Sequence, residues 1–143
     1  MSAETGADMS RFPTPGQLCA WAGVAPASYE SAGKRRPSGT RHGSQWLRRA
    51  LIESARSAAR TKASYYSAQY ARIARRRGAN KAAVAVANSM LFTIWHLLST
   101  GAFYDDPGAD YFVRCHDPAV EAKRLARRIE ALGFDVSLIE RAA

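Results

Sequence analysis

The segment 82–100 constrains the fold more than any other part of the chain. Its large apolar residues occur on nearly every side of a helix: Val84, Val86, Met90, Leu91, Phe92, Ile94, Trp95, Leu97 and Leu98. A helix that is apolar all round is typically buried at the centre of a domain. We therefore expect a central helix, with Asn80 as its N-cap and Gly101 at its end.

Four other segments have the start and stop signals of shorter helices. They are 14–23, which begins at Thr14 and Pro15, 44–62, which Ser44 caps, 64–77, and 118–132. The last is followed by an alternating run, 134–139, that is either an edge strand or an extended tail. The sequence thus predicts an all-α bundle of four or five helices with one long basic loop and, as one alternative, a short C-terminal strand.

Length and composition predict one folded domain. The chain has 143 residues, of which 47% are hydrophobic, enough for a core. We expect a disordered or extended start at 1–12, a helical domain at 13–104 and an extension at 105–143. The chain has no run of eighteen apolar residues and no secretory signal, so we expect a soluble, cytoplasmic protein without a membrane partner. Cys19 and Cys115 are then reduced, and their surroundings do not resemble a zinc site.

Positive charge is concentrated in one part of the chain. Between Lys34 and Arg77 there are thirteen Lys or Arg residues and one acidic residue, Glu53. Such a segment suits a polyanion, because neutralising phosphates releases condensed counterions. In the helix expected at 44–62, an apolar side carries Leu47, Ala50, Leu51, Ser54, Ala55 and Ala58, and Arg49, Arg56 and Arg60 lie opposite. We therefore expect a nucleic acid as a partner.

The segment 26–43 is rich in Gly, Pro, Ser and basic residues, which indicates a long loop. Ser31 lies in it and is the candidate nucleophile towards a phosphodiester, since neighbouring guanidinium groups would stabilise charge on the phosphoryl oxygens. The plainer alternative is a solvated serine, because no His or Asp base adjoins it and His42 could reach it only through folding of the loop. The expected phosphate contacts are Lys34, Arg35, Arg36, Arg41, Arg48 and Arg49, followed by Arg56 and Arg60.

Three other groups of side chains are candidates for a functional role. Asp105 with Asp106, and Asp110 with Asp117, could hold a metal, although solvated loop carboxylates explain them better, so we assign no metal site. His96 is expected to be a hydrogen-bonded core histidine rather than a ligand. The tyrosines at positions 65, 66 and 70 either stack on bases or pack the bundle, and the sequence favours neither alternative.

Several motifs together resemble a known family. They are Trp21-Ala22-Gly23-Val24-Ala25-Pro26, Glu30-Ser31-Ala32-Gly33-Lys34-Arg35-Arg36, Thr40-Arg41-His42-Gly43-Ser44-Gln45-Trp46-Leu47-Arg48-Arg49-Ala50-Leu51, and the block 82–104. In order and spacing they resemble the C-terminal transposase domain of the insertion-sequence one-ten/one-sixteen/nine-oh-two family. The resemblance covers roughly 8–143. Many relatives have Ser-Gly where this chain has Ser31-Ala32-Gly33.

The resemblance implies a recombinase of mobile elements. Ser31 matches the serine that is thought to attack DNA and form a phosphoserine link. In the family this domain works with an N-terminal RuvC-like domain, whose Asp-Glu-Asp-Asp site holds metal, so Mg²⁺ is expected there and no cofactor is expected in this chain. A structured guide RNA and a homo-oligomer are further implied partners.

Nothing in the chain resembles the RuvC-like half. The isolated polypeptide is therefore expected to be inactive alone, as a fragment, a decayed copy, or a partner of a catalytic half supplied in cis or in trans. Two other hypotheses stay open. One is a non-catalytic module that binds nucleic acid, and the other is an assembly or dimerisation domain.

Overall fold

The chain divides into two compact units, 1–109 and 110–143, which are described separately. The structure is a computed structural model that describes residues 6, 8–27, 30–31, 34–35, 39–40, 42–115 and 118–139, with the backbone alone at 30, 31, 34, 35 and 118. The domain limits drawn from the sequence at 104 and 105 stay a prediction.

The N-terminal unit is built from helices. After a 3₁₀ turn, η1 (Met9–Arg11), come α2 (Pro15–Trp21), α3 (Gln45–Ala58), α4 (Tyr65–Arg77) and α5 (Ala79–Thr100). Three of these helices begin where a hydroxyl side chain accepts a hydrogen bond from a backbone N–H of the first turn, which satisfies one of the donors left over at a helix start. The capping residues are Thr14, Ser44 and Ser64. These starts were predicted, and the all-α fold class is confirmed.

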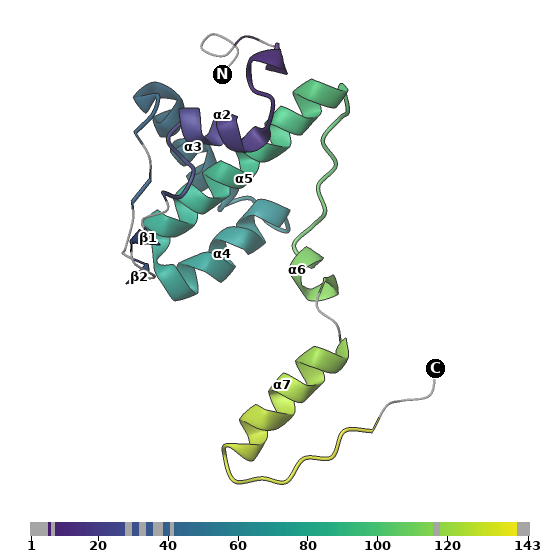
Figure 1. Ribbon diagram of the computed structural model, residues 1–143. Coiled ribbons are helices and arrows are strands. Elements are labelled where there is room, and N and C mark those ends of the chain that lie inside the picture. The colour runs from purple at the N-terminus through teal and green to yellow at the C-terminus, as the bar shows by residue number, and fades with distance from the viewer. Residues whose placement is uncertain are drawn as a thin grey trace. The chain divides into compact units, whose positions relative to one another are not determined.

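Helix α5 is the centre of this unit, and α2, α3 and α4 all pack against it (Figure 1). The cluster of buried residues joins α2, the segment after it, α3 and α5: Met9, Leu18, Cys19, Ala22, Val24, Leu47, Leu51, Ala55, Val86, Ala87 and Leu91. Burying each large aliphatic side chain stabilises the fold by roughly 1.5–3 kcal/mol. The predicted central helix is therefore present.

The limits of these helices differ from the expected ones in two places, and part of the expected apolar side of α3 is exposed. Helix α3 ends at Ala58 instead of near 62, and Ala50 and Ser54 are exposed rather than on its apolar side. Helix α5 begins at Ala79, directly after Gly78 turns the chain with a φ of 85°, so Asn80 lies inside the first turn and is not the N-cap. A glycine tolerates this φ without strain, which lets α4 and α5 follow each other without a loop.

The second half of α5 is less buried than its sequence predicted. Phe92 and Leu98 are 39% and 41% exposed, and the fully buried residues of α5 all lie between Ala82 and Leu91. By length and mean hydropathy α5 could cross a membrane. The core helix of a globular domain passes the same test, and α5 packs against three helices of its own unit.

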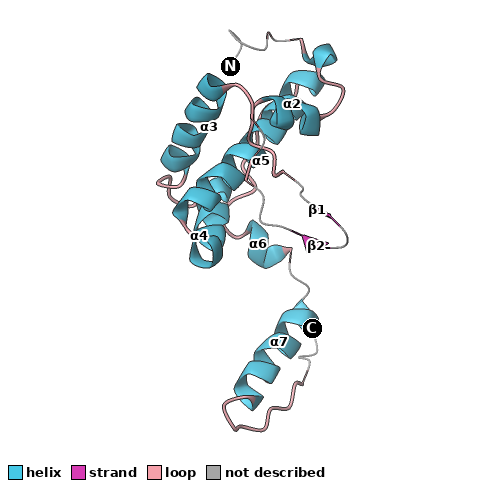
Figure 2. Cartoon of the chain, turned by 60° about the vertical axis from the view of Figure 1, so that its left-hand side comes forward, coloured by secondary structure: helices cyan, strands magenta, loops and turns pink. Residues whose placement is uncertain are grey.

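The segment 26–43 contains a β-hairpin that the sequence did not predict. Pro26 and Thr40 form an antiparallel bridge, and the N–H of Ala27 donates to the carbonyl of Gly39 at 3.0 Å. Further along, the two-residue strands β1 (Glu30–Ser31) and β2 (Lys34–Arg35) pair antiparallel. Figure 2 shows these strands standing apart from the helices.

The C-terminal unit contains α6 (Tyr111–Arg114) and α7 (Pro118–Glu130). Helix α7 was predicted, and α6 was not. The run 134–139 forms neither helix nor strand, so the edge-strand alternative is wrong and the tail alternative holds. Among the described side chains of α7, Ala126 is buried, whereas Val120, Leu125 and Ile129 are exposed.

Candidate nucleic-acid interface

The end of α2 and the start of α3 are pressed together at the backbone. A Cβ on Gly43 would lie 2.4 Å from both the N of Gly23 and the carbonyl oxygen of Trp21, so only glycine fits there. The N–H of Ser44 donates to the same carbonyl at 3.1 Å. This contact holds both ends of the hairpin segment at one place, and it explains why the Trp-Ala-Gly and His-Gly-Ser motifs occur together in the sequence.

The segment leading into the hairpin is also attached to α5. The side-chain amide of Asn88 donates to the carbonyl of Val24 at 3.5 Å, and the thiol of Cys19 donates to the carbonyl of Asn88 at 3.8 Å. Burial raises the pKa of Cys19 to about 11, so this residue stays a neutral thiol at physiological pH. The chain therefore enters the hairpin from a rigid part of the core.

The register of the hairpin pairs the candidate nucleophile with a cationic residue. Ser31 lies opposite Lys34, and Glu30 lies opposite Arg35. Residues directly opposite in an antiparallel pair are nearest neighbours across the two strands. The backbone thus brings two predicted site residues, Ser31 and Lys34, to facing positions. Two others, Arg36 and Arg41, fall outside the described residues.

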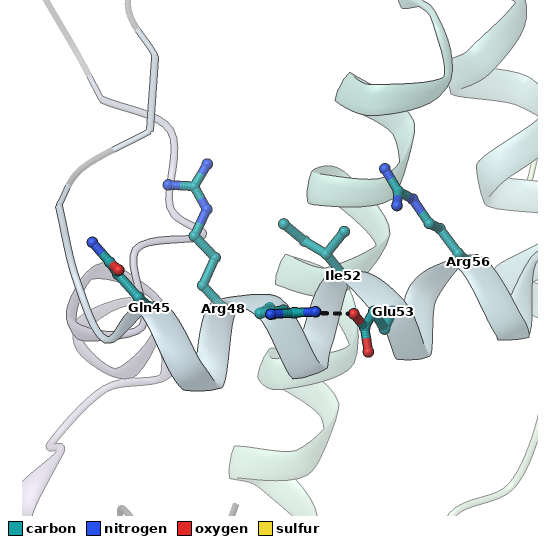
Figure 3. Close-up of a pocket in the computed structure, with 6 residues that line it drawn as sticks. Gln45, Arg48, Ile52, Glu53 and Arg56 are labelled. Carbon is teal, nitrogen blue, oxygen red and sulfur yellow. Dashed lines mark hydrogen bonds and ion pairs between the residues drawn. The ribbon is translucent and has the colours of Figure 1, made fainter.

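The arginines of α3, together with Arg60 in the turn that follows the helix, form a stripe along one side, which we call the α3 stripe. Arg48 is half-buried, and Arg49, Arg56 and Arg60 are exposed. A groove of about 320 Å³ runs along this side, lined by Gln45, Arg48, Arg49, Ile52, Glu53 and Arg56. Figure 3 shows Arg48 and Arg56 extending from the same side of the helix, with Ile52 between them.

One carboxylate lies within the stripe. Glu53 accepts from Arg49 at 3.2 Å, and the two side chains are 63% and 77% exposed, so the pair contributes little to stability. Arg56 donates to the amide oxygen of Asn80 at 3.4 Å, which links α3 to the start of α5. Within the described part of the chain, no carboxylate pairs with Arg48, Arg56 or Arg60. The stripe keeps a net positive charge.

A second cavity, of about 590 Å³, lies at the foot of the hairpin. Its lining residues come from the hairpin base and from α3, α4 and α5: Val24, Pro26, Gly39, Thr40, Arg48, Gln69, Asn80, Lys81, Val84, Ala85, Asn88 and Ser89. Arg48 belongs to this cavity and to the α3 groove, so the two are adjacent. The side-chain amide oxygen of Gln69 is buried without a hydrogen-bond partner in the described structure.

A family model described as "Transposase IS116/IS110/IS902 family" matches residues 1–71. This part of the chain belongs to that transposase family. A relative from Pseudomonas aeruginosa, named "Probable family 20 transposase", is 33% identical over 106 residues, which are 71% of this chain and 31% of the relative. The chain thus spans about a third of that relative's length. No solved structure matches it.

The region of this transposase domain matched by the family model contains the hairpin and the α3 stripe, together with all eight cationic site residues predicted from the sequence.

The sequence analysis missed two exposed residues outside that list. Trp46, in the first turn of α3, is 77% exposed, and Lys81 lies in the first turn of α5, where a cation opposes the helix dipole. A lysine at the start of a helix is electrostatically unfavourable, and this signal in the sequence could have identified Lys81.

Two of the four carboxylates considered in the segment 105–117 have structural partners, and Asp117 lies outside the described residues. Asp106 accepts from the N–H of Tyr65 at 3.0 Å, at the start of α4, and from the N–H of Gly108 at 2.9 Å. Asp110 pairs with Arg114 at 2.9 Å. Among the described residues no group of three His, Cys, Asp or Glu side chains could hold a metal ion, so the Mg²⁺ implied by the family has no ligand set here.

The structure favours packing for two of the three tyrosines whose role was open. Tyr66 and Tyr70 pack against the core, and the Tyr66 hydroxyl bonds to the hydroxyl of Thr93 at 2.9 Å. Tyr66 also stacks on Tyr104, with ring centroids 6.1 Å apart. His96, in contrast, is exposed, so its reading as a core histidine is wrong. It lies in the last two turns of α5, where Leu98 is exposed as well.

Proposed function

We propose that this chain is the DNA-handling part of an insertion-sequence transposase, and that Ser31 is the nucleophile of strand exchange. The observation that carries the proposal is the register of the hairpin, which puts Ser31 opposite Lys34 in a segment of the family-matched region whose base adjoins an arginine-lined helix. A positively charged surface beside a nucleophile suits a phosphodiester substrate, because cations stabilise the charge that develops on phosphoryl oxygens.

The proposed step exchanges one phosphate ester for another. The Ser31 oxygen attacks phosphorus and forms a phosphoserine ester, its proton passes to a base, and the bond from phosphorus to a deoxyribose oxygen breaks, so that the sugar leaves as an alcohol. Attack by a second strand's hydroxyl on the phosphoserine reverses these changes and frees Ser31. The number of ester bonds is conserved, so no external energy source is needed.

Duplex DNA would lie along the α3 stripe. Arg48, Arg56 and Arg60 have no competing carboxylate in the described structure, whereas Arg49 would have to exchange Glu53 for a phosphate. We rank Arg49 below the other three for this reason. A RuvC-like half would supply the metal chemistry, in cis or in trans, and a structured guide RNA and a homo-oligomer are part of the same proposal. We propose a cytoplasmic location without a membrane partner.

The test mixes the full chain with a matching RuvC-like half, duplex DNA and Mg²⁺, and looks for a protein–DNA adduct that survives denaturant. Mass spectrometry should place the adduct on Ser31. Ser31→Ala should abolish it, and Ser57→Ala, which alters an exposed serine of α3, should not. Repeated failure to trap an adduct with Ser31 intact, while DNA still binds, would leave the non-catalytic binding module as the better description.

A further inference from the structure

We propose that the 590 Å³ cavity at the foot of the hairpin binds one unpaired nucleotide of the bound nucleic acid. This proposal rests on the proposed function, since it assumes that the chain binds nucleic acid. The volume lies in the range of sites that enclose small ligands, which is roughly 300–1,000 Å³. A base inside a duplex is stacked on both sides and cannot enter such a cavity, so the ligand must be unpaired.

The polar side chains of the cavity suit the edge of a base. Gln69, Asn80 and Asn88 come from α4 and α5, and each amide offers both a donor and an acceptor. Amide side chains pair well with bases, which also present donors next to acceptors. The hydroxyl of Thr40 adds one further group of either kind, whereas the hydroxyl of Ser89 already bonds to Gln69 and to the carbonyl of Ala85.

The remaining lining residues suit the other parts of a nucleotide. Arg48 and Lys81 are the cations among the described lining residues, and a phosphate is the group that they would hold. Pro26 and Val84 provide apolar surface for the face of a base, since Val24 is buried in the core. A ligand with one anionic end, one flat apolar face and one edge of mixed donors and acceptors matches all three sets.

One amide of the cavity lacks a full set of partners. The Gln69 nitrogen donates to the hydroxyl of Ser89 at 2.8 Å, while its oxygen is buried without a partner among the described residues. A buried acceptor without a hydrogen-bond partner destabilises the chain. An N–H donor of a base would offset this destabilisation once the amide turns its oxygen towards the base. We therefore expect Gln69 to contact the base.

The position of the cavity connects it with the nucleophile. Pro26 and Thr40 line it, and they form the bridge at the base of the hairpin that carries Ser31. The contact of Gly43 with the end of α2 fixes this base. A nucleotide held here would tie the path of one strand to the base of the hairpin, so the cavity would select a strand with an unpaired position near the site of exchange.

The test titrates the full chain with each of the four deoxynucleoside monophosphates, the four ribonucleoside monophosphates, and inorganic phosphate alone, while NMR follows the side-chain amides. At least one nucleotide should move the signals of Gln69, and phosphate alone should not. The deoxy and ribo arms decide whether DNA or RNA supplies the ligand. Gln69→Leu should weaken nucleotide binding about tenfold, and Gln17→Leu, an exposed glutamine of α2, should leave it unchanged.

Val84→Phe, which fills the cavity, is the second variant, and its folding is checked by circular dichroism. It should abolish nucleotide binding and leave binding of a fully paired duplex intact. The cavity proposal is overturned if no nucleotide moves the Gln69 signals while the wild-type chain still binds duplex, a result that leaves the proposed function standing. If neither nucleotide nor duplex binds, both proposals fail together.

Discussion

The two units of this chain differ in how completely they bury their apolar residues. In the N-terminal unit, Leu18, Val86 and Leu91 are fully buried between helices. In the C-terminal unit, which has only 34 residues, Leu125, Ile129 and Leu132 remain 42–73% exposed. Units below about 40 residues rarely bury enough surface to be stable alone. The fold and the candidate interface therefore depend on the N-terminal unit. Substitutions in that unit should affect stability and binding more than substitutions in the C-terminal unit.

The two cysteines provide the widest contrast between the units. Cys19 is fully buried, and burial raises its pKa to about 11, whereas Cys115 is exposed. Because a thiol reagent needs access and a thiolate, Cys115 should react on the order of a thousandfold faster at pH 8. Labelling with a chromogenic disulfide under native conditions measures both rates, and Cys115→Ser isolates the slow one.

Equal rates for the two thiols would contradict the burial of the α2–α5 core.

The pH dependence of the free energy of unfolding offers a second check on Cys19. The folded chain keeps the Cys19 proton that the unfolded chain loses near pH 9, so this contribution to stability is complete below pH 9 and is lost as the pH rises towards 11. Stability that rises over this interval would contradict the shift.

Truncating one leucine in each unit should give the next largest difference. Leu91→Ala leaves a cavity where α5 meets the core and should lower the free energy of unfolding by about 2–5 kcal/mol. Leu132→Ala, at a position 73% exposed, should change it by less than about 0.5 kcal/mol. Urea denaturation followed by circular dichroism measures both. Similar losses at the two positions would mean that the C-terminal unit has a core of its own.

The start positions of the helices were predictable because capping is local. Thr14, Ser44 and Ser64 each bond to a backbone N–H three residues further on, and a sequence shows both partners. The hairpin was not predictable, since its base depends on the contact of Gly43 with Trp21 and Gly23, about twenty residues away. The cavity beside it combines side chains from several segments, and only tertiary packing brings them together.

The same distinction explains the errors. Asn80 has the chemistry of an N-cap, but Gly78 starts the helix two residues earlier. His96 lies in a strongly apolar segment, yet its exposure depends on which neighbours cover that half of α5. Periodicity identified the apolar side of α3 well enough to place Leu47, Leu51 and Ala55, and therefore also the arginines opposite them.

Two glycines of the hairpin segment allow a matched test of its anchoring. Gly43→Ala would bring a Cβ within 2.4 Å of backbone atoms and should destabilise the chain by about 1–3 kcal/mol. Among the described atoms, the Cβ of Gly39→Ala meets none within 4 Å, so this variant should stay within about 0.5 kcal/mol of wild type. Thermal unfolding measures both variants. A tolerated Gly43→Ala would show that the two ends of the hairpin segment are not held together as described.

The smallest expected effect concerns single charges of the α3 stripe. Arg56→Gln removes one cation that has no carboxylate partner in the described structure, so the slope of log K against log salt for duplex DNA should fall by about 0.9. The affinity itself should drop only a few fold. Arg124→Gln, in α7 of the C-terminal unit, removes a cation that already pairs with Glu121 at 2.6 Å and should leave the slope unchanged. Fluorescence anisotropy from about 50 to 300 mM salt separates the two outcomes. The affinity should change by about one decade or more over this range. If Arg124→Gln lowers the slope as much as Arg56→Gln does, phosphates contact both units, and the interface cannot be confined to the part of the chain that the transposase family model matches.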